Sequence, residues 1–115
     1  MAFLKGTQSE IPVKVVAKID RGVDGVIEVP FTLIYRHVPL SKARVQHDQM
    51  LRDELTDDQV IRDNLIGWRD LKGEDGAEIP FSADVLAEML EWVGYRNALV
   101  VGFKEAQFGR AAEKN

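Results

Sequence analysis

The chain has no cysteine and only two histidines, His37 and His47, among its 115 residues. Without cysteine, disulfides, thiolate nucleophiles and cysteine-ligated zinc or iron–sulfur sites are excluded. Two histidines cannot form a three-histidine zinc site within one chain, and neither stands in an HExxH context. GxGxxG, P-loop and G-x-S-x-G patterns, which are typical of nucleotide binding and of serine hydrolases, are also missing. We therefore expect no cofactor, no metal and no enzymatic activity.

Long apolar runs are missing as well. The longest uncharged apolar runs, residues 98–103 and 29–35, are far shorter than the roughly 20 residues that a membrane helix needs. Met1–Lys5 is followed by no apolar region of the kind found in secretory signals. We expect a single domain over residues 1–115 that does not associate with a membrane and resides in the cytoplasm.

The net charge of the chain is −4, and the charged residues are distributed unevenly along it. Residues 48–95 carry thirteen Asp or Glu against four Lys or Arg, whereas residues 1–47 and 96–115 are net positive. The acidic middle would repel phosphate backbones, and neither flank has a dense basic cluster, so we expect no nucleic-acid binding. We interpret the acidic stretch as a solvated face; contact with a basic protein partner is the alternative.

The first third of the chain predicts an antiparallel β-hairpin over residues 11–36. Apolar residues alternate with polar ones from Ile11 to Ile19 and again from Ile27 to Tyr35, which is the period of a strand with one buried face. Between the two runs, residues 20–25 contain two glycines that suit a tight reversal. Because a two-stranded ribbon is marginal alone, helices or a partner must cover its apolar face.

From residue 41 to residue 110 the pattern predicts about four α-helices packed on the hairpin. Ser41 is expected to cap a helix over Lys42–Leu55, and Thr56 with Gln59 has the spacing of a capping box for a helix that extends through Trp68. Ser82 is expected to cap a helix over residues 83–92 that Gly94 breaks, and a final helix ends near Gly109. Residues 111–115 are expected to form a frayed tail. The predicted class is α+β.

Nine aromatic residues are spread along the chain, and we expect most of them in the core. Phe3, Trp92 and Phe108 lie near the chain ends or at a helix end, where aromatic side chains can anchor a protein partner. Together with Phe103, they are the residues that we expect to contact a partner.

Several segments together resemble tail assembly chaperones of long-tailed bacteriophages and prophages. They are the stretch Leu65–Leu71 with its Gly-Trp pair, the acidic glycine loop after it, the Ile-Pro-Phe-Ser run at 79–82, the helical residues that follow, and Val29–Leu33 in the first half. The likeness covers nearly the whole chain as an order of features. Where that family would have a Phe-Lys or Phe-Arg pair at the end of the strand, this chain has Tyr35-Arg36-His37.

The resemblance implies a non-enzymatic protein that coats the tape-measure protein, and contacts tail-tube subunits, while tails assemble in the host cytoplasm. Two alternatives remain. One is a structural tail component, such as a small tail-tube or connector subunit, and the hairpin edge offers self-association in either case. The other is a small enzyme whose site forms between subunits and uses His37 or His47.

Overall fold

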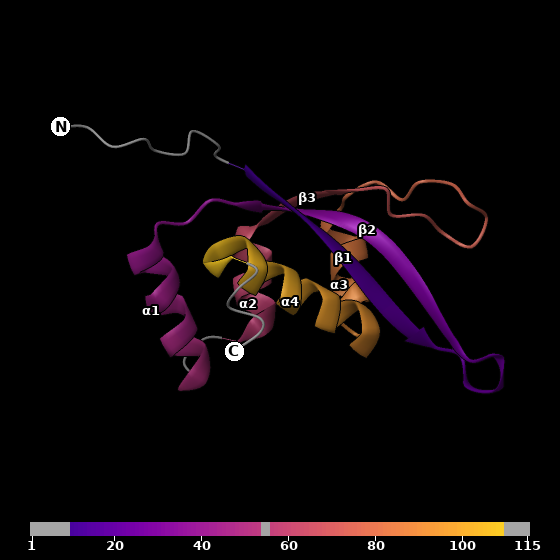
Figure 1. Cartoon of the computed structure of the whole chain (residues 1–115), viewed down its shortest axis with the longest axis horizontal. Helices are drawn as coiled ribbons and strands as arrows, with labels where there is room; N and C mark the ends of the chain where they lie inside the picture. The colour runs from indigo at the N-terminus through magenta and orange to yellow at the C-terminus, as the bar shows by residue number, and fades with distance from the viewer. Residues whose placement is uncertain (1–9, 54–55, 110–115) are drawn as a thin grey trace.

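The computed structural model describes residues 10–53 and 56–109, which form one three-stranded sheet and four α-helices (Figure 1). The expected tail and Phe3 lie outside these residues. In chain order the elements are β1 (Glu10–Asp20), a short 3-10 turn (Gly22–Asp24), β2 (Val26–Arg36), α1 (Leu40–Leu51), α2 (Asp57–Asn64), β3 (Leu65–Arg69), α3 (Ala83–Met89) and α4 (Val93–Phe108). The predicted α+β class, with an N-terminal hairpin followed by helices, is confirmed.

β1 and β2 form a long antiparallel hairpin without a register shift. Ile11 lies opposite Tyr35, and Ile19 lies opposite Ile27, so the apolar residues of both strands share one face. At the turn, the Arg21 N–H donates to the Gly25 carbonyl oxygen at 2.9 Å. Gly22 and Gly25 have φ angles of 66° and 81°, which glycine adopts without strain. The alternation and the glycine turn therefore predicted this element correctly.

The third strand replaces the second half of a predicted helix. α2 ends at Asn64, and residues 65–69 pair with β2 as β3, so the expected helix through Trp68 is wrong. The pairing shifts register, with Gly67 opposite Ile34 but Leu65 opposite Tyr35. This bulge puts Leu65 and Trp68 on the same face although they are three residues apart. Their spacing is helical in the sequence because an extra residue interrupts a strand.

Three helix boundaries also differ from the prediction. α1 begins at Leu40 after Pro39 rather than behind Ser41, and it ends at Leu51; residues 54 and 55 of the predicted helix lie outside the described ranges. α3 ends at Met89. By contrast, the Thr56 capping box and the Ser82 cap are both present as predicted, with the Ser82 hydroxyl accepting from the Val85 N–H. Side-chain caps were recognisable because their chemistry is local.

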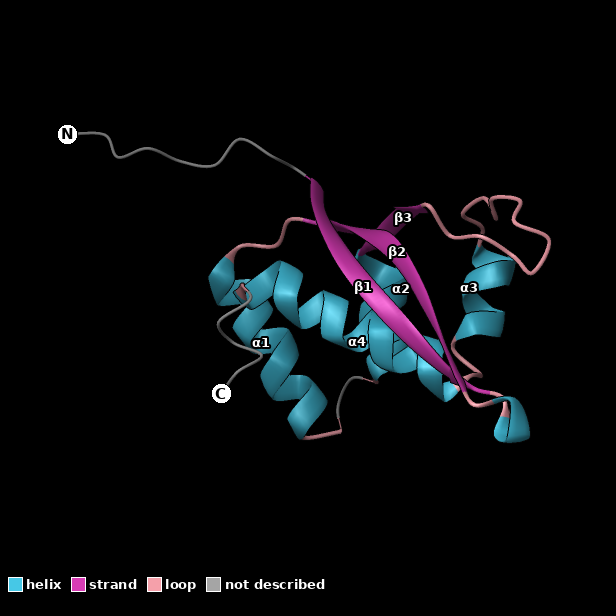
Figure 2. Ribbon diagram, turned by 45° about the vertical axis from the view of Figure 1, so that its right-hand side comes forward, coloured by secondary structure: helices cyan, strands magenta, loops and turns pink. Residues whose placement is uncertain are grey.

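α4 lies along the apolar face of the hairpin (Figure 2). Gly94 does not break a helix but sits in the first turn of α4, where a Cβ would lie 2.2 Å from the Lys18 carbonyl oxygen. Farther along, a Cβ on Gly102 would lie 2.7 Å from a Leu33 methyl carbon. Both glycines therefore permit a close approach of helix and sheet, which buries Leu33 and Phe103 between them.

In the described ranges, none of the helices combines the length and the apolar character that crossing a membrane would take.

Candidate functional site

An open groove of about 910 Å³ lies at the turn end of the hairpin, and we call it the distal groove. Its walls are the last part of β1, the first part of β2, the loop over residues 71–79, α3 and the first turn of α4. Nine apolar or aromatic side chains line it: Ile19, Ile27, Val29, Leu71, Ile79, Val85, Met89, Trp92 and Tyr95. Concave apolar surfaces of this kind are typical of binding sites.

The hairpin side of the groove is apolar because the alternation of β1 and β2 continues past the covered part of the sheet. β3 pairs only with residues 32–35 of β2, so the hairpin beyond them has two strands. Along the same face, Leu33 is fully buried, whereas Ile27 is 41% exposed. The sequence thus provides more apolar strand face than the helices cover.

The loop wall is held by Trp68, whose indole N–H donates to the Ile79 carbonyl oxygen at 2.8 Å. The Trp68 ring also meets Phe81 edge to face, with centroids 4.7 Å apart. The base of the loop is closed by the Ile79 N–H, which donates to the Leu71 carbonyl oxygen at 2.7 Å. The Gly-Trp and Ile-Pro-Phe-Ser segments noted in the sequence therefore fix the position of the loop that forms one wall of the groove.

An ion pair links the two sides of the groove. The Arg21 guanidinium, beside the hairpin turn, pairs with the Glu74 carboxylate on the loop. Partial burial raises the pKa of the nearby Tyr95 phenol, and the positive charge of Arg21 offsets part of that rise. The pair joins two elements that are far apart in the sequence, and it is exposed on both sides.

The chain that forms the loop and α3 is strongly acidic. Between residues 70 and 91 all seven carboxylates are exposed, and Lys72 is the sole basic residue of that segment: the acids are Asp70, Glu74, Asp75, Glu78, Asp84, Glu88 and Glu91. The charged side chains that line the distal groove itself are Asp20, Glu74 and Glu88 with Arg21 and Lys72, so acids outnumber bases there. The apolar floor therefore lies beside a rim whose excess of carboxylates makes the local electrostatic potential negative.

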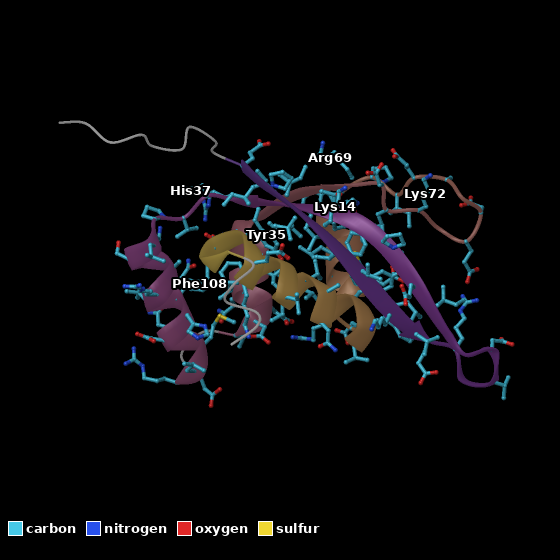
Figure 3. All side chains as sticks on the ribbon, in the orientation of Figure 1. Lys14, Tyr35, His37, Arg69, Lys72 and Phe108 are labelled. Atoms are coloured by element: carbon cyan, nitrogen blue, oxygen red, sulfur yellow. The ribbon has the colours of Figure 1, made fainter. Side chains whose placement is uncertain are left out.

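Of the four residues expected to contact a partner, Trp92 lines the groove and is 62% exposed. Phe103 is only 2% exposed and meets Tyr35 edge to face, so its place on the sheet side of α4 puts it in the core and not on the surface of the described residues. Phe108 packs against His47 with ring centroids 5.7 Å apart. It lies near α1, at the opposite end of the molecule from Lys72 (Figure 3).

Sequence reasoning missed most of the groove. Ile27 and Tyr95 were interpreted as strand and core residues, and nothing local distinguishes them from Leu33 or Phe31, which are buried. The one available signal was the length of the hairpin, since eleven-residue strands exceed what α4 and the short β3 cover. That mismatch appears only when the elements are assembled.

A smaller hollow of about 380 Å³ lies between β1 and α4. It is lined by Lys14, Val16 and Lys18 of β1 and by Asn97, Val101 and Glu105 of α4, among others. β1 is an edge strand of the sheet, so this hollow runs beside a strand edge that no other described strand pairs with.

Within residues 10–53 and 56–109, no group of three or more His, Asp or Glu side chains is arranged to hold a metal ion. Comparison with protein-family models, with curated proteins and with solved structures finds no match for this chain.

Proposed function

We propose that this protein is a non-enzymatic tail assembly chaperone of a long-tailed phage or prophage, which binds apolar segments of the tape-measure protein in the host cytoplasm. The order of sequence features that resembles this family supports the proposal. A tape-measure protein exposes apolar helix faces that aggregate unless they are covered, and a small domain with an apolar groove can cover them.

The distal groove is the observation that carries the proposal. Its lining combines aliphatic side chains with Met89, Trp92 and Tyr95, residue types that are enriched at adaptable protein-binding surfaces. Trp92 is 62% exposed and Ile27 is 41% exposed, although both are apolar. Repeated weak contacts of this kind along a long client would hold it by avidity and still permit release.

A structural tail component is the second candidate, favoured by the open edge of β1. An edge strand of eleven residues can accept a strand from a neighbouring subunit. However, Pro12, Lys14 and Lys18 on this strand are residue types that discourage edge pairing. For this reason the chaperone, which rests on the groove, is the first proposal, and the structural tail component, which rests on the strand edge, is the second.

Co-expression with the tape-measure protein of the same genome, followed by size-exclusion chromatography, tests the two candidates. The chaperone proposal expects a soluble tape-measure protein that co-elutes with several copies of this chain. Ile27→Lys and Trp92→Ala should abolish co-elution, whereas Val45→Lys, at an exposed position on α1, should preserve it. Large rings or tubes formed by this chain alone, with the tape-measure protein insoluble, would contradict the chaperone and support the structural subunit.

A further inference from the structure

We infer that the occupant of the distal groove is a cationic amphipathic α-helix, one that presents an apolar stripe flanked by Lys or Arg. The inference rests on the proposed function and deepens it, because it states which segments of a client protein this chain would select. It follows from the floor of the groove and from the charge on its rim.

The floor favours a helix because it is made of side chains rather than of an open strand edge. Ile19 and Val29 come from the sheet face, and Val85 and Met89 come from α3, so the two sides converge on an occupant that contributes side chains of its own. A volume of about 910 Å³ corresponds to roughly two turns of an α-helix about 10 Å wide. Helix-in-groove recognition uses apolar anchors with this spacing.

The rim favours a basic occupant because its acidic side chains outnumber its basic ones. The segment 70–91 presents seven exposed carboxylates and one lysine around the loop and α3. Glu88 lines the groove beside Met89, and Glu91 is exposed three residues farther along. The cations of the lining are Arg21 and Lys72, beside the anions Asp20, Glu74 and Glu88, and Arg21 is paired with Glu74. Complementary charges at the edge of an apolar contact add affinity that falls with ionic strength.

The opposite face of the sheet has a different charge. Lys14 lies across from Thr32 on β2, and Thr32 lies across from Arg69 on β3, which places both cations on the face that points away from the core. Lys18 lies four residues after Lys14 on the same face, across from Glu28 on β2. The acidic rim is therefore a property of the groove side and not of the whole surface.

Isothermal titration calorimetry with synthetic peptides tests the inference on the full chain. The probe is an 18-residue peptide with Leu at i, i+3, i+4 and i+7 and Lys elsewhere. One control replaces every Lys by Glu, and a second alternates Leu and Lys, which favours a strand. We expect the helical Leu/Lys peptide to bind at least about tenfold more tightly than either control at low ionic strength, and the advantage over the Glu peptide to shrink at high salt.

Charge-reversal variants locate the contact. Glu88→Lys with Glu91→Lys should weaken binding of the helical Leu/Lys peptide about tenfold, whereas Glu10→Lys with Asp63→Lys should change it less than about twofold. All four positions are exposed, so the two pairs match in charge change, and of the four only Glu88 lines the groove, with Glu91 three residues away. Equal binding of the Lys and Glu peptides, tighter binding of the alternating peptide, or equal effects of the two variant pairs would each overturn the inference.

The result separates this inference from the proposed function. If the variant Glu88→Lys with Glu91→Lys still co-elutes with a soluble tape-measure protein, the chaperone proposal stands and the basic-helix inference fails. If the helical Leu/Lys peptide binds as expected but the tape-measure protein stays insoluble, the inference stands and the chaperone proposal fails.

Discussion

The two halves of the hairpin have the same alternation of apolar and polar residues, but other elements cover the apolar face of one half and leave that of the other half partly exposed. In the half near the chain start, Leu33 and Tyr35 are fully buried under α4 and beside β3. In the half near the turn, Ile27 on the same face of the same strand is 41% exposed, and Val29 is only partly buried. The pattern defines which face is apolar, but coverage by other elements decides whether that face becomes core or binding surface.

The open half, like the covered half, joins parts of the chain that are far apart in the sequence. Arg21 at the turn pairs with Glu74, and Tyr95 of α4 packs near Phe31 with ring centroids 6.2 Å apart. The groove therefore has walls that are tied together, although its floor is uncovered. Because contacts between distant segments fix its walls, this apolar surface is a formed groove and not simply the exposed border of the core.

The largest effect should come from truncating the same face in the two halves. Leu33→Ala removes a fully buried side chain and leaves a cavity, so we expect the free energy of unfolding to fall by about 3 kcal/mol. Ile27→Ala, on the same strand face but 41% exposed, should cost no more than about 1 kcal/mol. Urea denaturation of both variants measures the difference. Similar costs would mean that the distal half is covered in solution.

The close approach of α4 to β1 should be the next most sensitive feature. In Gly94→Ala the new methyl group would lie 2.2 Å from the Lys18 carbonyl oxygen, so the backbone must shift, at a cost of about 2 kcal/mol. Gly67→Ala in β3 is the matched control, because no atom lies within 4 Å of its added Cβ. Thermal unfolding followed by circular dichroism should show a clear decrease for the first variant and little change for the second.

Alkaline pH should affect the two halves through their tyrosines. Burial raises the pKa of Tyr35, whose hydroxyl donates to the Leu99 carbonyl oxygen at 2.6 Å. Above the ordinary tyrosine value of about 10 the unfolded chain ionises while folded Tyr35 keeps its proton, so stability present below that pH is lost at up to about 1.4 kcal/mol per pH unit.

Urea denaturation between pH 9 and pH 11 compares the two positions. Tyr35→Phe should remove most of the loss, whereas Tyr95→Phe should remove a smaller part, since Tyr95 is only partly buried and Arg21 offsets the rise in its pKa. A larger effect at Tyr95 would reverse the assignment of buried and open halves.

The smallest effect should come from the ion pair across the groove. Arg21→Met should lower the free energy of unfolding by no more than about 0.5 kcal/mol, because the Arg21 and Glu74 side chains are 44% and 83% exposed. A double-mutant cycle with Glu74→Gln measures the pair directly. A coupling free energy well above 1 kcal/mol would show that the ion pair stabilises the position of the groove wall.

Local chemistry made much of the fold predictable. The hairpin followed from alternation and a glycine turn, and the starts of α2 and α3 followed from Thr56 and Ser82. β3 was missed because a bulge gave Leu65 and Trp68 a helical spacing. Gly94 was interpreted as a helix breaker because its close neighbour, Lys18, is 76 residues away in the sequence. Each error concerns a contact with a residue that lies far away in the sequence, which the local pattern does not reveal.

The sequence by itself determined the α+β class, the apolar face of the hairpin, the caps of two helices and the acidic character of residues 70–91, since each depends on neighbouring residues alone. Only the tertiary structure decided that Phe103 is buried, that Trp92 is open, and that the far half of the hairpin faces a groove. Burial is a property of assembled surfaces: an apolar side chain becomes core or binding site according to what other elements place over it.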